Sequence, residues 1–157
     1  MSLEEKNKAL ICKFETEAIN KHNPDMLDEL MKPDYVDHPL QLRGLEENKQ
    51  AFAMNLKGFP DWHETIEDII AEGDKVWLRF KATGTHKGEL RGVLAPSGVL
   101  APTGKKITIT GVVIYRMVNG KMVEKESAVY DFLDYYKQLG IIEYTEKGKK
   151  LFPEEAK

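Results

Sequence analysis

The sequence lacks the features that would place it in a membrane or in an oxidising compartment. It has one cysteine, Cys12, among 157 residues, so no disulfide can form within the chain, which fits a reducing cytoplasm. No apolar run approaches the ~18 residues of a membrane span. The charged segment from Met1 to Lys8 has no apolar signal-peptide core. We therefore expect a cytoplasmic protein with no membrane partner.

Several classes of ligand are also disfavoured by what is missing. The formal net charge of −3 provides no general attraction for nucleic acids. The sequence contains no phosphate-binding loop, no dinucleotide fingerprint and no Gly-x-Ser-x-Gly turn. Its four histidines lack the short spacing of known metal motifs. We expect no nucleic-acid partner, no metal and no cofactor.

The order of predicted elements indicates an α+β fold. Helical spacing of apolar residues predicts helices over residues 4–22, 25–31 and 44–57. After Pro60 the period changes to that of strands, and helices followed by antiparallel strands are typical of α+β domains. We assign residues 1–145 to one domain. Residues 146–157, with the basic run from Lys147 to Lys150, are interpreted as a polar tail.

The strand-rich half contains clear local signals. Residues 62–70 form a first strand with Trp62, Ile66 and Ile70 as its apolar positions. An apolar face defines the second strand, through Val76, Leu78, Phe80 and Ala82. Residues 107–117 have the composition of a strand buried on both faces. Asn119-Gly120 predicts a tight hairpin turn, residues 121–130 form the return strand, and Gly140 ends a last helix over 132–139.

One segment is nearly repeated. Residues 93–98, Val-Leu-Ala-Pro-Ser-Gly, are followed by Val-Leu-Ala-Pro-Thr-Gly at 99–104. Two copies of six residues are too few for a solenoid. We interpret them as a lengthened loop between two strands, which can be a lid, an oligomer contact or a tolerated insertion.

Four short motifs follow one another in a fixed order. They are Phe59-Pro60-Asp61, Gly84-Thr85-His86-Lys87-Gly88, Pro102-Thr103-Gly104-Lys105, and Asp131 followed by Gln138-Leu139-Gly140. In this order the chain resembles the SnoaL-like polyketide cyclase (ester cyclase) family. The resemblance implies the cone-shaped fold of nuclear transport factor 2 and ketosteroid isomerase, with a curved antiparallel sheet packed on N-terminal helices. It also implies cofactor-free acid/base chemistry next to a carbonyl, as in the intramolecular aldol closure of a polyketide-like or ester-bearing substrate.

Asp131 is the first candidate catalytic residue. It lies between a β-like stretch and the last helix, where burial can raise the pKa of a carboxyl and make it a general base. The resemblance implies the same role, because the family has its acid/base Asp before the Gln-Leu-Gly helix. Asp131 is also well placed to cap that helix. A capping carboxylate is held ionised, so the two interpretations compete.

His86 is the second catalytic candidate, through its motif at 84–88. A neutral imidazole can donate a hydrogen bond to a substrate carbonyl and stabilise an enolate; the alternative is a partly exposed turn histidine.

His38, with Tyr35 beside it before Pro39, is either a loop histidine or, as the resemblance implies, part of a cavity mouth. The remaining candidates for ligand binding are three side chains of the first two strands: Trp62, Trp77 and Arg79. For Trp77 and Arg79 the alternative is a solvated outer face.

The strand from Lys121 departs from the family pattern. The family has a Trp two residues after a Glu. In this chain the residue two positions after Glu124 is Glu126, not Trp. The distance from Gly120 to Asp131 is one residue longer than usual, which requires a bulge that changes the faces of later side chains. Two alternatives to cyclase chemistry therefore stay open: an isomerase or hydrolase on the same fold, or non-catalytic binding of a small apolar ligand.

A homo-oligomer is expected, with a dimer as its simplest form. The open face of the curved sheet, which carries Val112 and Ile114, would otherwise expose an apolar patch. Isologous dimers are the commonest assembly. The predicted partners are thus a second copy and a small apolar or carbonyl-bearing molecule.

Overall fold

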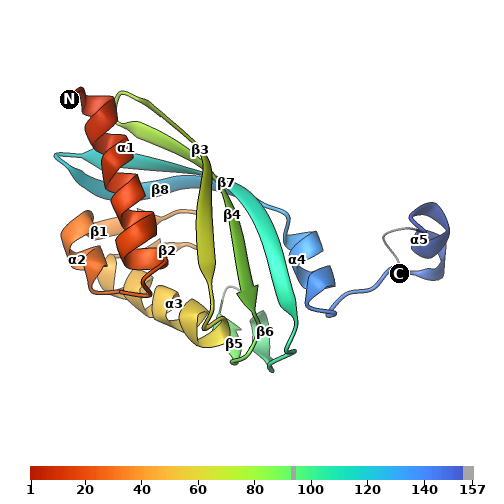
Figure 1. Ribbon diagram of the computed structural model, residues 1–157. Helices are drawn as coiled ribbons and strands as arrows, with labels where there is room; N and C mark the ends of the chain where they lie inside the picture. Colours follow the sequence, from red (N-terminus) through yellow and green to blue (C-terminus); the bar gives the residue numbers. More distant parts are fainter. Residues whose placement is uncertain (93–94, 154–157) are drawn as a thin grey trace.

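The computed structural model describes residues 1–92 and 95–153, and within them the chain forms one curved sheet covered by helices (Figure 1). The six-stranded sheet has the order β2-β1-β8-β7-β4-β3, and β5 and β6 form a separate two-stranded sheet. The strands are β1 Met31–Asp37, β2 Leu42–Arg43, β3 His63–Glu72, β4 Lys75–Thr85, β5 Leu90–Gly92, β6 Ala95–Leu100, β7 Lys106–Val118 and β8 Lys121–Tyr130. This arrangement confirms the α+β class.

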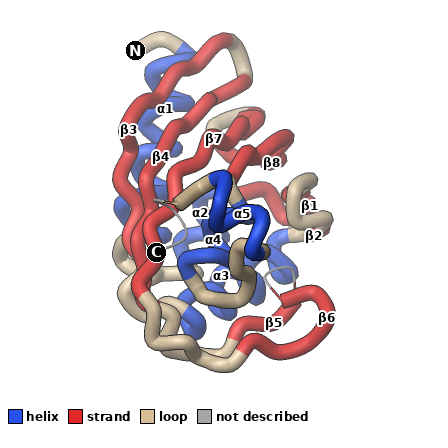
Figure 2. Tube along the Cα trace, turned by 90° about the vertical axis from the view of Figure 1, so that its right-hand side faces the viewer, coloured by secondary structure: helices blue, strands red, loops and turns tan. Residues whose placement is uncertain are grey.

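The helices lie mostly before the sheet in sequence. They are α1 Leu3–Lys13, the π-helix η1 Phe14–Ile19, α2 Met26–Leu30, α3 Leu45–Gly58, α4 Phe132–Gln138 and α5 Glu146–Leu151. Ser2 and Glu5 form a capping box that starts α1. Figures 1 and 2 show α1 crossing one face of the sheet beside β3 and β4, with α3 near the end of the sheet where β5 and β6 lie. The helix expected over 4–22 is thus an α-helix continued by a π turn.

The last part of the chain contains a helix that the sequence analysis did not predict. Residues 146–151, expected within a polar tail, form α5, which begins with the Thr145 side chain accepting a hydrogen bond from the Gly148 N–H. Lys137 donates a hydrogen bond to the Tyr144 hydroxyl at 2.7 Å. Figure 1 shows α5 beyond α4 and away from the sheet.

The sheet confirms some expectations and corrects others. Val76, Leu78, Phe80 and Ala82 are all buried on one face of β4, as the alternation predicts. The strand β7 is buried on one face only, whereas burial on both faces was expected. The pairing of β1 with β8 is parallel, so the sheet is not wholly antiparallel. This pairing joins segments about 90 residues apart, which no local pattern can specify.

A bulge in β3 corrects the face of Ile70. Ile66 pairs with Phe80 but Asp68 pairs with Arg79, so Glu67 is an extra residue in the ladder. The bulge turns Ile69 inward and leaves Ile70 58% exposed on the outer face.

The duplicated segment also differs from the expected loop, because residues 95–100 form strand β6; Val93 and Leu94 lie outside the described residues.

Three of the family-like motifs pack against one another at the end of β4. The Thr85 N–H and hydroxyl both donate to the Asp61 carboxylate, at 2.6 and 2.7 Å. The Lys87 and Gly88 N–H groups donate to the Gly58 carbonyl. A Cβ on Gly88 would lie 1.9 Å from the Lys57 carbonyl oxygen, so glycine is required by backbone packing. These motifs hold α3, β4 and the loop before β7 together.

This packing predicts an unequal response to alanine at two glycines. Gly88→Ala should lower the free energy of unfolding by about 1–3 kcal/mol, because the backbone must shift to admit the methyl group. Gly98→Ala is the control, since a Cβ there meets nothing within 4 Å; its effect should stay within ~0.5 kcal/mol. Urea unfolding measures both, and equal effects would contradict the assigned contact.

Candidate functional site

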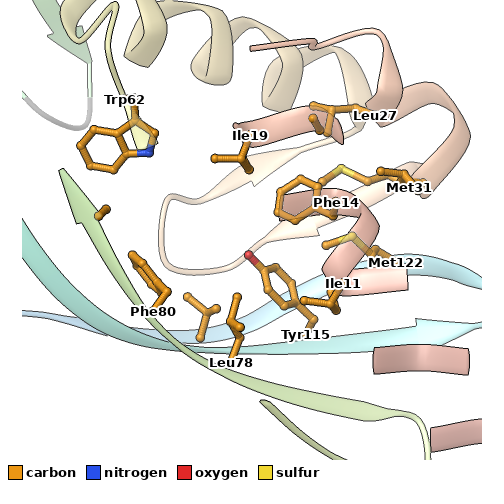
Figure 3. Close-up of a cluster of buried hydrophobic side chains, with 14 of the residues drawn as sticks. Ile11, Phe14, Ile19, Leu27, Met31, Trp62, Leu78, Phe80, Tyr115 and Met122 are labelled. Carbon is orange, nitrogen blue, oxygen red and sulfur yellow. The ribbon is translucent and has the colours of Figure 1, made fainter. Parts of the chain in front are cut away.

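A cavity of about 450 Å³ lies between the concave face of the sheet and the helices. Its walls are mostly apolar. They include Phe14, Ile19, Leu27, Met31, Phe52, Trp62, Phe80, Ile109 and Val113. Figure 3 shows several of these side chains, and the Tyr115 ring of the sheet points toward Phe14 of η1. A cavity of this size and lining can exclude bulk water from a small apolar molecule.

One buried ion pair lies on the cavity wall. The Lys125 ammonium donates to an Asp37 carboxylate oxygen at 2.5 Å, and both side chains are largely buried. Burial by itself would lower the pKa of Lys125, but Tyr130, Tyr35 and Asp37 outweigh it and raise the pKa above its usual range. Lys125 therefore stays charged, and Asp37 supplies the counter-charge that a buried ammonium needs.

A bulge in β8 turns Lys125 into the cavity. Ile114 pairs with Ser127 and the next residue, Tyr115, pairs with Lys125, so Glu126 is an extra residue in the ladder. Lys125 consequently shares the inner face with Tyr115. Glu126 lies outside, where its carboxylate accepts from Lys75 at 2.7 Å. The bulge expected from the longer Gly120–Asp131 spacing is therefore present, with a second at Val123.

Tyr35 and Tyr130 interact with the Lys125 ammonium, and Tyr115 is the strand partner of Lys125. Burial raises the pKa of Tyr35, Tyr115 and Tyr130 above the ordinary value for a phenol. All three line the cavity. Their hydroxyls therefore remain neutral and can donate hydrogen bonds. Together with Lys125 they give one side of the cavity the capacity to stabilise a negatively charged oxygen.

Two carboxyls meet on the other side of the cavity. Glu64 of β3 lines the cavity and accepts a hydrogen bond from the Trp62 indole N–H at 2.7 Å. Glu15 of η1 is only 2% exposed and hydrogen-bonds with Glu64. Burial, and then the neighbouring Glu64, raise the pKa of Glu15 well above its ordinary value. Burial also raises the pKa of Glu64, against the hydrogen bond from Trp62.

The structure places His86 in the packing of the motifs. The His86 side chain is fully buried, and its Nδ1 accepts from the Thr103 N–H at 3.2 Å. Nε2 therefore carries the proton. Burial lowers the pKa of His86, against a backbone hydrogen bond with Gly88 that raises it, and keeps the ring neutral. His86 is not among the residues that line the cavity, so its catalytic role stays a prediction.

The placement of Asp131 matches the capping interpretation. Asp131 is exposed, and its carboxylate accepts from the Asp134 N–H at 2.9 Å at the start of α4. It does not line the apolar cavity, in contrast to its neighbour Tyr130, but lies at a more open hollow on the outer face. Asp131 is therefore not buried as expected, and its role as a general base stays a prediction.

The predicted binding residues fall into two groups. Tyr35 and Trp62 line the cavity. His38 is half-exposed and pairs with Glu124 at 2.6 Å outside it. Hydrogen bonds from His38 and then Arg116 lower the pKa of Glu124.

Trp77 is 51% exposed on the outer face, and Arg79 pairs there with Glu67 at 2.9 Å. Neither Trp77 nor Arg79 lines the cavity; Arg79 lines a more open hollow on the outer face instead, and a binding role for the two residues stays a prediction.

Sequence reasoning missed the ionisable groups in the cavity, Glu64 and Lys125, and Glu15 beside it. Glu15 lies four residues after Ile11 and three before Ala18, so a carboxylate on an apolar helix stripe was its signal. Glu64 and Lys125 offered no such signal. The face that each presents depends on the register of its strand.

The described residues show neither a metal cluster nor a membrane helix. No group of three or more His, Cys, Asp or Glu residues in the described ranges is arranged to hold a metal ion. In the same part of the chain, no helix has both the length and the apolar composition to cross a bilayer.

Comparison with known proteins gives one family match and several similar structures. The profile of SnoaL-like polyketide cyclases matches residues 9–139. TsrD from Streptomyces laurentii is similar in fold, with a TM-score of 0.77 and 23% identity over 90% of this chain and 99% of that one. AclR from Streptomyces galilaeus has a TM-score of 0.75 and 28% identity, covering 92% of this chain and 91% of AclR. IdmH from Streptomyces antibioticus has a TM-score of 0.69 and 28% identity, covering 85% and 98%. No protein with a curated description matches the sequence.

The placement of Asp131 predicts that its side chain acts on stability. Asp131→Asn should leave the unfolding free energy nearly unchanged, because Asn is also a good helix cap, whereas Asp131→Ala should cost about 1 kcal/mol. Chemical unfolding measures the difference. A large loss of ligand binding or turnover in Asp131→Asn, with stability unchanged, would instead restore the general-base interpretation.

Proposed function

The chain belongs to the SnoaL-like polyketide cyclase family, and we propose that it is a cofactor-free enzyme that performs acid/base chemistry next to a carbonyl of a small, largely apolar molecule. The supporting observation is the composition of the cavity. Apolar walls enclose two polar groups, which are the Glu64 carboxyl with Glu15 behind it and the Lys125 ammonium with its neighbouring phenols. An apolar surround strengthens both the basicity of a carboxylate and the attraction of a cation for an oxyanion.

This composition suits the formation and use of an enolate. A carboxylate can remove a proton from the carbon next to the carbonyl, and neutral phenols or an ammonium can stabilise the oxygen that becomes negative. Attack of the enolate carbon on a second carbonyl of the same molecule is the aldol closure of a cyclase. Return of the proton to another carbon is an isomerisation. Both reactions begin with the same proton removal, so one assay covers both.

Catalysed hydrogen exchange tests the proposal without the natural substrate. We expect the protein to accelerate exchange of the α-hydrogens of 2-tetralone, acetylacetone or ethyl acetoacetate in D₂O, followed by NMR. Ala51→Trp, which fills the cavity from α3, should abolish the acceleration. Lys57→Trp is the control, because this residue is exposed near the end of the same helix. Circular dichroism confirms that both variants are folded. No acceleration of any probe by the wild type, or equal rates in both variants, would reject the proposal.

A homodimer through the outer face of the sheet is the proposed assembly. Ile70 and Trp77 are paired there, and Val112 and Val129 are paired beside them, all four exposed. Val112 pairs with Arg79, which lies two residues after Trp77 on the same face of β4. The four apolar side chains are therefore neighbours on the outer face and form one patch. An exposed apolar patch of this kind is typical of an interface.

Sedimentation of charge variants tests the assembly. The wild type should sediment as a dimer at micromolar concentration, and the double variant Val112→Lys, Val129→Lys should sediment as a monomer. Leu151→Lys, at an exposed apolar residue of α5, should stay dimeric. A wild type that sediments at the monomer mass of 17.9 kDa would rule out the dimer.

A further inference from the structure

The carboxyls of Glu15 and Glu64 share a hydrogen bond beside the cavity, although they come from different elements. The Asn20 side chain joins η1 to β3, because it donates to the Glu64 carbonyl and accepts from the Glu64 N–H, both at 2.8 Å. His22 contacts the Trp62 carbonyl at 2.7 Å and fixes the start of the same strand. These contacts hold Glu64 against Glu15, so the carboxyl contact is built into the fold.

We infer that Glu15 and Glu64 share one proton and that the Glu64 carboxylate is the base that removes the α-proton of an enolisable, uncharged carbonyl compound bound in the cavity. The inference rests on the proposed acid/base function and names the groups that perform it. Glu64 is the catalytic residue, because it lines the cavity. Glu15 is a positioning residue, because it lies behind Glu64 and is not among the lining residues.

The hydrogen-bond partners of the two carboxyls place the shared proton on Glu15. Two ionised carboxylates cannot bond to each other, so one of the pair must be protonated. The Glu15 carboxyl is almost fully buried, and its Oε2 has no hydrogen-bond donor among the described residues. Glu64 accepts from the Trp62 indole N–H. The neutral carboxylic acid is therefore Glu15, which donates to the carboxylate of Glu64.

The charged and titratable groups around the pair come from the strands across the cavity. Lys125 of β8 favours the ionised form of both carboxyls. Tyr115 of β7 and Tyr130 of β8 interact electrostatically with both Glu15 and Glu64. Tyr35 and Asp37 of β1 lie next to Lys125. With Lys125 paired to Asp37, the pair retains one negative charge, which disfavours an anionic substrate beside Glu64.

The reaction step balances with these groups alone. Glu64 takes the proton from the α-carbon, and the C–H electron pair becomes the C=C bond of the enolate. The carbonyl π electrons move to oxygen, which the Lys125 ammonium and neutral phenols stabilise. Glu64 is then a neutral acid, and it returns its proton either to another carbon of the enolate or to the alkoxide formed when the enolate attacks a second carbonyl. The carboxylate is regenerated, and no oxidant, metal or co-reactant is consumed.

Isosteric variants of the pair test the roles. Glu64→Gln keeps an acceptor for the Trp62 N–H but has no basic carboxylate, so exchange of 2-tetralone should fall by about 10²- to 10⁴-fold. Glu67→Gln on the outer face of the same strand is the matched control and should keep the wild-type rate. Exchange that persists in folded Glu64→Gln overturns the base role and leaves the proposed function standing. Absence of exchange in the wild type overturns both.

The pH profile distinguishes positioning from a merely structural role of Glu15. Glu15→Gln still donates an N–H to Glu64 but cannot ionise, so it should retain most of the neutral-pH rate and lose the alkaline inflection that ionisation of Glu15 produces. Glu15→Leu removes the donor, so the acid limb of the profile should move to higher pH. Identical profiles for the wild type and both variants would overturn the role of Glu15.

Stability against pH gives a test that needs no substrate. The fold raises the pKa of Glu15 above its ordinary value of 4.5, so the folded state holds the proton more tightly than the unfolded state. The stabilising contribution is complete below that ordinary value and is lost as the pH rises through the raised pKa. The wild-type Tm should therefore fall at alkaline pH more than that of Glu15→Gln. Glu17→Gln, at a half-exposed residue of the same helix that pairs with Lys21, should follow the wild type at alkaline pH.

Direct titration completes the test. In protein with ¹³C-labelled glutamate carboxyls, Glu15 should remain protonated at neutral pH while Glu64 is ionised. Two ionised carboxyls at neutral pH would overturn the shared proton whatever the exchange assay shows.

Discussion

The bulge at Glu126 is the constraint on which the chemistry of the cavity depends. Counted back from Ala128, which packs against the core, unbroken alternation would place Glu126 on the inner face of β8 and Lys125 outside. With the bulge, the ammonium of Lys125 enters an apolar interior, where an isolated charge is too costly to keep. Asp37 at 2.5 Å resolves this, and the parallel pairing of β1 with β8 brings the two residues together.

The cavity combines a favourable apolar lining with ionisable groups that an ordinary core would avoid. Burying Glu15, Glu64 and Lys125 opposes folding, and each requires a partner to remain inside. The partners are a second carboxyl, an indole N–H and an aspartate. Departures of this kind from local rules are typical of functional sites, and this is why the proposed function is placed in the cavity.

The motifs that identify the family have a mainly structural explanation in this chain. Asp61 binds Thr85, Gly88 lies against the backbone of Lys57, and His86 binds Thr103. These contacts fix the end of β4 against α3 and the loop before β7. The close approach of the backbone leaves room only for glycine at position 88. A motif can therefore mark the family through packing contacts that lie outside the cavity, since none of these motif residues lines it.

The sequence by itself determined the features that depend on near neighbours. The turn at Asn119-Gly120, the alternation along β4, the end of α4 at Gly140 and the capping position of Asp131 follow from backbone preferences within a few residues. The family and the fold class followed from the order of such signals. Tyr35 and Trp62 were also identified as pocket candidates, and both line the cavity.

Only the tertiary structure decided which side chains enter the cavity. A single extra residue in a strand reverses the face of those beyond it, so Ile70 turned outward and Lys125 turned inward. Glu15 and Glu64 meet because η1 crosses β3, a contact between residues 49 positions apart in the printed sequence. Bulges and long-range packing are set by the balance of the whole core, and local sequence patterns do not contain that balance.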